Sequence, residues 1–200
     1  MPNSARRNER SRQAILDAAL DLAAELGYQK LTIEAVAARA GVGKQTIYRW
    51  WPSKGAVLFD ALLARTQGAD GSPGALPDTG DLATDLKTVL RATVAEFADP
   101  AFAGPIRALT VELAQDPELA EQYQQRLDRP MRELKKARLR AAQEAGELRA
   151  DADLEVLVDL LFTPIAQRWL LRTGPLTPDY ADAIVDHALH GQLVSPARRG

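Results

Sequence analysis

The 200-residue sequence contains no cysteine, only two histidines and few aromatic residues (6%). The missing thiols exclude disulfides, thiolate zinc sites and cysteine nucleophiles, and two histidines do not make a multi-histidine metal site. No run approaches the roughly 20 apolar residues that a helix needs to cross a bilayer. The basic start MPNSARRNERSRQ has no apolar core behind it, which is not typical of a signal peptide. We therefore expect a cytoplasmic protein with no metal, no cofactor and no membrane segment.

The sequence also lacks the short motifs of common enzyme active sites. It has no phosphate-cradling glycine loop, no H-E-x-x-H and no G-x-S-x-G. Its many carboxylates do not indicate an active site, because a helical surface always supplies pairs of carboxylates. We therefore expect no enzyme and no catalytic residue.

The charges are unevenly distributed along the chain, although the formal net charge is only −2. Residues 1–60 carry nine basic and six acidic side chains, whereas the remainder carries sixteen basic and twenty-one acidic ones. Such a division can give an acidic protein one end that binds a polyanion. With 46% hydrophobic and 26% charged residues, the chain is typical of a folded globular protein.

Apolar residues recur with helical spacing from end to end, which predicts an all-α fold. Ile15, Ala19, Leu22 and Leu26 make the first apolar stripe, and Gly27 ends that helix because glycine adopts a left-handed conformation without penalty. Asp116-Pro117-Glu118 and Thr177-Pro178-Asp179 are typical helix starts. We expect helices near 11–26, 33–40, 44–50, 53–67, 82–98, 153–173 and 178–193, and one that begins at 117.

Residues 68–80, GADGSPGALPDTG, form the clearest linker, with four glycines and two prolines. This composition predicts an N-terminal domain with its connecting helix over 1–67, and a larger helical domain over 81–200.

Residues 33–52, IEAVAARAGVGKQTIYRWWP, have the pattern of a helix-turn-helix. Ala37 offers a small contact between the helices and Gly41 offers the turn, while Val36, Ala40, Val42 and Ile47 lock the helices together. The outer face of the second helix then holds side chains suited to base edges and phosphates, namely Lys44, Gln45, Thr46, Tyr48 and Arg49. Thr32 and Lys54 flank the motif at helix N-termini, where they can hold phosphate oxygens. An ordinary helical hairpin with a solvated face is the alternative.

The block from Arg10 to Arg65 resembles the N-terminal domain of TetR-family transcriptional regulators. The signatures AILDAAL, ELGY, LTIEAVAARAGV and TIYRWWPSK carry this resemblance, and they are specific as a set. Gly55 stands where many members have an acidic or larger residue. The resemblance implies a three-helix DNA-binding head, a connecting fourth helix, and a helical body that dimerises and usually binds a small-molecule effector.

The resemblance also implies roles for particular residues. It places Gln45, Thr46 and Tyr48 in the major groove, with Lys44 at the N-terminus of the recognition helix. Thr32, Tyr48 and Lys54 resemble the phosphate clamps of the family. We expect one of Trp50 and Trp51 to pack under the head and the other to face the phosphates. Trp50 is the one that we assign to the DNA-binding surface. The N-terminal segment is a basic arm that contains Arg6, Arg7, Arg10 and Arg12. This arm either follows the DNA backbone or minor groove or only keeps the chain soluble.

A dimer would place two recognition helices about 34–36 Å apart, one turn of DNA, and so would require a two-fold-related operator. We predict that the last two long helices pair into a four-helix bundle across the two-fold axis. The predicted interface residues are Leu157, Leu161, Ile165, Ile184, Ala188 and Leu189. In the alternative, both stripes face their own core.

Three prolines lie inside expected helices, at Pro105, Pro130 and Pro164, where each removes a backbone donor and favours a kink. Kinked helices can wall a cavity. We predict that an effector pocket is bordered by Phe97, Phe102, Tyr123, Phe162 and Trp169, with Arg168 as partner for an anionic group. Alternatively, these aromatic residues are core.

The sequence therefore predicts a DNA-binding transcriptional regulator. We expect a repressor that binds a palindromic double-stranded DNA operator as a homodimer and is released by a small molecule. A helical ligand-binding or adaptor protein that has lost operator binding is the alternative, although the intact TIYRWWPSK run argues against it.

Overall fold

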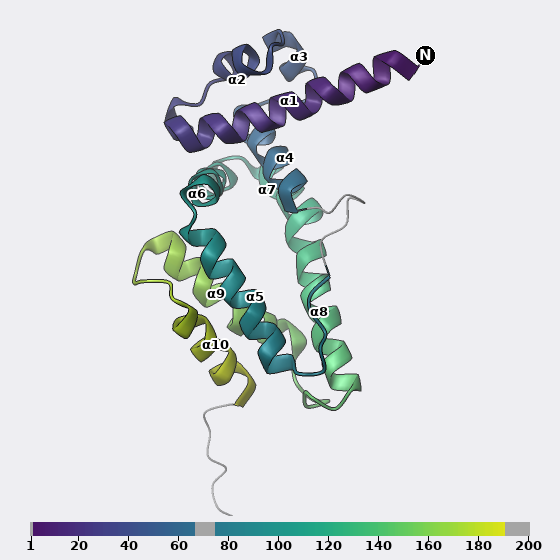
Figure 1. The fold of residues 1–200 in the computed structure, drawn as a ribbon, viewed down its shortest axis with the longest axis vertical. Coiled ribbons are helices and arrows are strands. Elements are labelled where there is room, and N and C mark those ends of the chain that lie inside the picture. Colours follow the sequence, from purple (N-terminus) through teal and green to yellow (C-terminus); the bar gives the residue numbers. More distant parts are fainter. Residues whose placement is uncertain (1, 67–74, 191–200) are drawn as a thin grey trace, which may run out of the picture. The chain divides into compact units, whose positions relative to one another are not determined.

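The computed structural model describes residues 2–66 and 75–190, apart from the side chains of residues 2–5 and 7, and all its regular elements are helical (Figure 1). The predicted all-α class is confirmed. The helices are α1 (Pro2–Leu26), η1 (Tyr28–Lys30), α2 (Ile33–Ala40), α3 (Lys44–Tyr48), α4 (Lys54–Thr66), α5 (Leu82–Ala98), α6 (Pro100–Gln115), α7 (Pro117–Tyr123), the π-helical turn η2 (Gln124–Asp128), α8 (Arg129–Glu144), α9 (Leu154–Leu171) and α10 (Pro178–His190).

The chain divides into two compact units. One combines the segment up to Gly74 with Asp99–Met131, and the other combines Ala75–Ala98 with the residues from Arg132 onward. These structural units differ from the predicted functional division, which places 81–200 in one domain. That division stays a prediction, and residues 68–74 of its linker and 191–193 of its last helix lie outside the described residues.

The local signals that end and begin helices act as the sequence predicts. Gly27 and Gly41 have positive φ angles of 76° and 66°. After α2, the amide of Val42 bonds the carbonyl of Ala37 and that of Gly41 bonds Ala38, which makes a Schellman cap. Asp116 accepts from the Leu119 amide. These caps fix where α2 and α7 stop and start.

The core of the first unit is built on the predicted stripe of α1. Ile15, Ala19 and Leu22 are buried together with Phe59 of α4. Leu26 was expected in the same stripe but is 46% exposed, because the helix ends there and the chain turns away at Gly27.

Gly55 allows α6 and α7 to approach the start of α4 closely. A Cβ atom at this position would lie 3.1 Å from Leu119 Cδ2 and 3.2 Å from Glu112 Oε2. The carboxylate of Glu112 also acts on Tyr28, whose pKa is raised by burial and by that neighbouring acid. The departure of Gly55 from the family pattern thus coincides with close packing between α4 and the segment 99–131.

The second unit packs α5, α8, α9 and α10 around a separate apolar core that includes Leu90, Leu139, Leu161 and Val185. Basic side chains of α8 pair with acids of α9: Arg132 lies 3.0 Å from Glu155 and 2.8 Å from Asp159. Arg132 is therefore paired with acids of its own unit.

All three prolines lie inside helical segments, as predicted. Pro105 and Pro164 lie inside α6 and α9. Pro130 is the second residue of α8, but α7, η2 and α8 follow one another without a break over 117–144. Proline has no amide donor, and the π-helical turn η2 directly before α8 interrupts the regular α-helical hydrogen bonding there.

Candidate nucleic-acid interface

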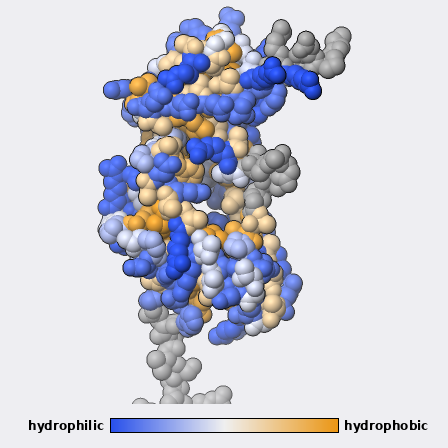
Figure 2. Space-filling view, in the orientation of Figure 1, coloured by the Kyte–Doolittle hydropathy of each residue, from blue (hydrophilic) through white to orange (hydrophobic). Residues whose placement is uncertain are grey.

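The helix-turn-helix has the predicted inner and outer faces. In Figure 1, α2 and α3 lie beside each other along α1, and their mutual contacts bury Ile47 completely, with Val36 1% exposed. Tyr48 is 52% exposed. Figure 2 shows hydrophilic residues over much of the visible face of the head. The outer face of α3 presents Lys44, Gln45, Tyr48 and Arg49 to solvent, with Thr46 half-buried.

Two ion pairs link α2 to its neighbours. The ammonium of Lys44 donates to Glu34 Oε1 at 3.2 Å, joining the first turns of α2 and α3. The guanidinium of Arg39 donates to both oxygens of Glu25 at 3.0 and 2.9 Å. Two hydrogen bonds lower the pKa of Glu34. The larger effect comes from its own backbone amide and the smaller from Lys44. Both pairs are exposed, and both acids are charged at neutral pH.

The two tryptophans, Trp50 and Trp51, differ in burial and in their contacts. Trp51 is 3% exposed and donates from Nε1 to Asp60 Oδ2 at 2.8 Å. Trp50 is half-buried and meets Trp51 edge-on, with ring centroids 5.5 Å apart. The guanidinium of Arg49 lies 5.2 Å from the Trp50 ring. Trp51 is thus the ring that packs under the head, and Trp50 is the one that reaches the surface.

Asp60 of α4 joins several elements of the first unit. Besides Trp51, its carboxylate lies 2.8 Å from Arg126 of η2 and 3.5 Å from Arg12 of α1. Arg126 also covers the face of Phe59 at 5.2 Å. The turn after α3 is therefore fixed through one half-buried acid to α4 and to the π-helical turn.

The residues predicted to flank the motif have partners of their own. The Thr32 hydroxyl accepts from the Ala35 amide at 3.1 Å and caps α2. The ammonium of Lys54 donates to the carbonyl oxygens of Tyr28 and Leu31 at 3.1 and 3.2 Å, and lies 4.2 Å from the Tyr28 ring centroid. Lys54 thereby fastens the start of α4 to η1, with one of its three N–H groups left for another acceptor.

Glu34 and Asp60 take part in this site but were not predicted as site residues, although their positions in the sequence are unusual. Glu34 is the only acid between Thr32 and Phe59, and Asp60 is the next acid after it. An isolated carboxylate in a basic or apolar stretch needs a specific partner, but the sequence does not show which side chain supplies it.

The predicted effector residues belong to different units. Phe102 and Tyr123 lie in the first unit, where Tyr123 packs on Phe59 at 5.9 Å, and the others lie in the second. There Phe97 stacks on Trp169 at 4.5 Å. The Lys135 ammonium lies 3.8 Å above the ring of Phe162.

Arg168 takes part in the turn between α9 and α10. It donates from Nε to the Pro175 carbonyl at 3.0 Å and covers the Tyr180 ring at 4.2 Å. Arg168 thus already has acceptors within its own unit, and its predicted contact with an anionic effector stays a prediction.

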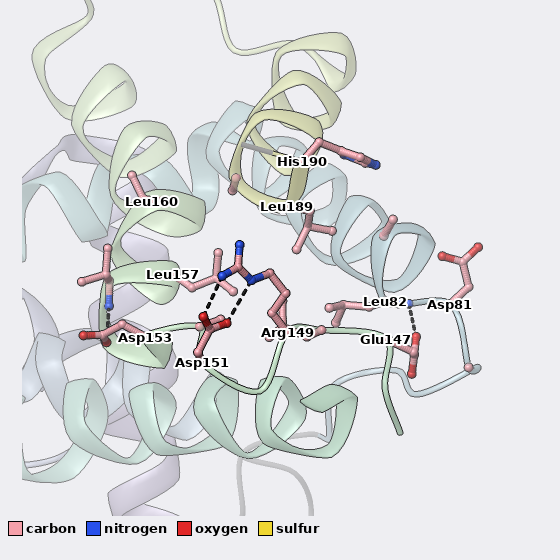
Figure 3. A pocket seen from close by; sticks show the side chains of 16 residues that line it. Asp81, Leu82, Glu147, Arg149, Asp151, Asp153, Leu157, Leu160, Leu189 and His190 are labelled. Atoms are coloured by element: carbon pink, nitrogen blue, oxygen red, sulfur yellow. Dashed lines mark hydrogen bonds and ion pairs between the residues drawn. The ribbon is translucent and has the colours of Figure 1, made fainter. Parts of the chain in front are cut away.

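A pocket of about 720 Å³ lies in the second unit, between the start of α5, the loop before α9, the first turns of α9 and the end of α10 (Figure 3). Its lining includes the leucines Leu82, Leu157, Leu160 and Leu189. Arg149 and Asp151 form an ion pair at its edge, with the closer contact 2.6 Å. None of the six predicted effector residues lines this pocket. Arg168 alone of them lines a second hollow, beside Leu160 and Tyr180.

The predicted interface residues split between the core and the surface. Leu157, Leu161 and Ile165 are at most 6% exposed and lie in the core of their own unit, whereas Ile184, Ala188 and Leu189 are half-buried. The outward face of α9 is apolar instead at four other positions, namely Val156 (52% exposed), Leu160 (52%), Leu170 (38%) and Leu171 (59%).

This arrangement defines a helix-turn-helix protein with a larger helical body. None of the helices in 2–66 and 75–190 is long and apolar enough to cross a membrane. The family model described as "Bacterial regulatory proteins, tetR family" matches residues 15–61, and the model "Tetracyclin repressor-like, C-terminal domain" matches 76–188. The chain belongs to the TetR family of transcriptional regulators.

Relatives match nearly the whole chain. An uncharacterized HTH-type transcriptional regulator of Bacillus subtilis (strain 168), YdeS, is 37% identical over 192 residues, covering 96% of this chain and 94% of the relative. A DNA-binding transcriptional repressor TetR of Mycobacteroides abscessus is 29% identical over 196 residues, covering 96% and 98%. The crystal structure of the TetR family transcription regulator SCO0332 is similar with a TM-score of 0.75 and 34% identity, over 92% and 99% of the two chains.

Proposed function

We propose that this regulator represses transcription by binding a palindromic operator as a homodimer, and that a small-molecule effector releases it. The outer face of α3 carries this proposal: Lys44, Gln45, Tyr48 and Arg49 stand exposed over the buried Ile47. These side chains suit base edges and phosphate oxygens in a major groove. The protein would act in the cytoplasm as a DNA-binding regulator and not as an enzyme.

The apolar outer face of α9 supports the homodimer. Val156, Leu160 and Leu171 expose more than half of their surface, and Leu160 also borders both hollows of the second unit. A second copy that packs here would remove this surface from water. The dimer interface that we propose therefore consists of the outer face of α9 and the half-buried residues of α10. It does not include Leu157, Leu161 and Ile165.

The pocket of the second unit supports effector binding. Its leucine lining and its charged edge suit a ligand with an apolar body and a polar group. Such a ligand releases DNA only if it binds the non-DNA-binding arrangement of the heads more tightly. The adaptor alternative makes no use of the exposed face of α3.

Selection of bound fragments from random duplex DNA tests operator binding. We expect enrichment of a two-fold-related site whose half-sites lie one helical turn, or a multiple of it, apart. Failure to enrich any sequence at low ionic strength would support the adaptor alternative.

Gln45→Ala should then alter discrimination at one base position of the selected site. The exposed amide at the start of α3 can pair with a base edge, and its loss costs about 1–3 kcal/mol of discrimination there. Affinities for a set of singly substituted operators measure this effect. An equal loss on every substituted operator would show that Gln45 does not read bases.

A further inference from the structure

A single carboxylate lies within the proposed DNA-binding surface. Between Thr32 and Phe59 the sequence contains one acid, Glu34. It occupies the first turn of α2, its side chain is 63% exposed, and its carboxylate lies 3.2 Å from the ammonium of Lys44. Because Lys44 is the first residue of α3, the ion pair brings the first turns of α2 and α3 to the same edge of the motif.

Stability gives only a small reason for an acid at this place. A carboxylate in the first turn of a helix is favoured by the helix dipole by about 0.3–1 kcal/mol, and exposed ion pairs contribute about 0–1 kcal/mol. Against a DNA duplex, a carboxylate that meets phosphates is repelled. It is favourable at such a surface where it accepts a hydrogen bond from a base amino group.

We propose that Glu34 is a specificity-determining residue, which accepts a hydrogen bond from the N4 amino group of a cytosine in each half-site. This inference rests on the proposed function. The amino groups of cytosine N4 and adenine N6 are both donors in the major groove, and the characteristic partner of Glu and Asp side chains is cytosine N4. Lys44 neutralises the carboxylate beside the phosphates and has further N–H groups for the O6 and N7 atoms of a neighbouring guanine.

The ionisation of Glu34 fits this role. Its pKa is lowered, and the carboxylate is therefore the form that meets DNA at neutral pH. A carboxylate has two oxygens with about four acceptor positions, so that a bond to Lys44 leaves capacity for a base.

Glu34→Gln tests the proposal on the operator selected with the unaltered protein. Affinities are measured for that operator and for every single base-pair change, in one half-site. With Glu34 we expect cytosine at one position to be favoured by about five- to 150-fold. With glutamine, which pairs bidentately with adenine, the preference at that position should move towards adenine while the other positions keep theirs.

Glu25→Gln is the matched control. Glu25 is also an exposed acid of the head and also pairs with a basic residue of the motif, Arg39. Its substitution changes the net charge by the same amount, and so it measures the general gain in affinity from removing one negative charge. We expect the base preferences of this variant to equal those of the unaltered protein.

A second variant separates a direct contact from an effect through Lys44. In a Lys44→Met background, the cytosine preference should persist and should still move when Glu34 is changed to glutamine. Its disappearance in that background would assign the preference to Lys44 and overturn the proposal.

Other outcomes are equally decisive. If Glu34→Gln and Glu25→Gln tighten binding to all duplexes by the same factor and leave every preference unchanged, Glu34 reads no base. A changed preference at a position that is not cytosine in the selected operator would also overturn the proposal. Failure of the unaltered protein to select any DNA would contradict operator binding itself, which is a distinguishable result.

Discussion

Lys54 shows how one side chain can serve both the fold and the proposed DNA contact. Its position at a helix N-terminus and the family resemblance predict a phosphate clamp. In the structure its ammonium bonds two carbonyl oxygens of the η1 region and lies over the Tyr28 ring, while the side chain stays partly exposed. A change at this position should therefore alter stability and DNA affinity together.

Lys54→Met keeps the aliphatic stem and removes the charge. We expect the free energy of unfolding to fall by about 1–3 kcal/mol, because two carbonyl oxygens lose a charged donor. Binding to all duplexes should weaken, and the slope of log K against log salt should flatten by about one unit. Urea denaturation and titrations at several salt concentrations measure the two effects.

Lys44→Met is the stability control for that experiment, since Lys44 also begins a helix and its side-chain partner within residues 2–66 and 75–190 is the exposed acid Glu34. Its stability should stay within about 0.5 kcal/mol of the unaltered protein. For Lys54→Met, lowered stability with an unchanged salt slope would assign Lys54 to the fold alone.

At the scale of elements, a buried ion pair joins α5 to α8. Arg138 is 6% and Asp85 3% exposed, and their side chains lie 2.9 Å apart. Arg138 also donates to the Pro77 carbonyl at 2.9 Å, and Thr79 donates to Asp85 from its amide and its hydroxyl. This cluster fastens the segment before α5 to the two helices. The hydrogen bond from Arg138 lowers the pKa of Asp85, although burial acts in the opposite direction.

The lowered pKa of Asp85 predicts an acid-sensitive contribution to stability. The unfolded chain protonates this carboxyl near its ordinary value of about 3.9, whereas the folded chain does so only at lower pH. Its contribution is therefore present above about pH 5 and is lost as the pH falls through the folded pKa. Asp85→Asn should lower the free energy of unfolding at pH 7 by about 3–5 kcal/mol and make the acid limb of the stability curve shallower.

Urea denaturation from pH 7 down to the acid transition measures both changes. Asp78→Asn removes an exposed acid that lies 3.2 Å from the same guanidinium, and should cost at most about 1 kcal/mol at pH 7. Acid limbs of equal steepness in Asp85→Asn and the unaltered protein would contradict the role given to Asp85.

At the scale of the whole molecule, we expect the outer face of α9 to lie in the interface of the proposed homodimer. Leu160→Glu places a charge at its middle, where a second copy would bury it, and should convert a dimer into monomers, as measured by sedimentation equilibrium. Val111→Glu is matched in exposure, at 50% against 52%, and lies on α6. It should remain dimeric. A dimer that survives Leu160→Glu unchanged would exclude this face from the interface.

Local chemistry explains why many elements could be predicted from the sequence. The bounds of α2 follow from Thr32 as a cap and from Gly41 as a left-handed residue, and both signals lie within a few residues of the helix ends. Helical spacing likewise predicted that Ile47 faces inward and Tyr48 outward. The family followed from a run of motifs in one continuous stretch, so that no long-range contact was needed to identify it.

The burial of helix faces and the partners of charged side chains depend on residues that are far apart in the sequence. Periodicity showed that Leu157, Leu161 and Ile165 form a stripe, but only packing against α5 and α10 showed that their own unit buries it. Likewise, the partner of Asp60 on η2 and that of Lys44 on α2 depend on the path of the chain in three dimensions. The sequence by itself determined the all-α class, the ends of helices with clear local signals such as α2, and the family, because these depend on neighbouring residues. The tertiary structure decided which faces are buried and which charges are paired, because burial and pairing depend on what the rest of the chain places opposite each side chain.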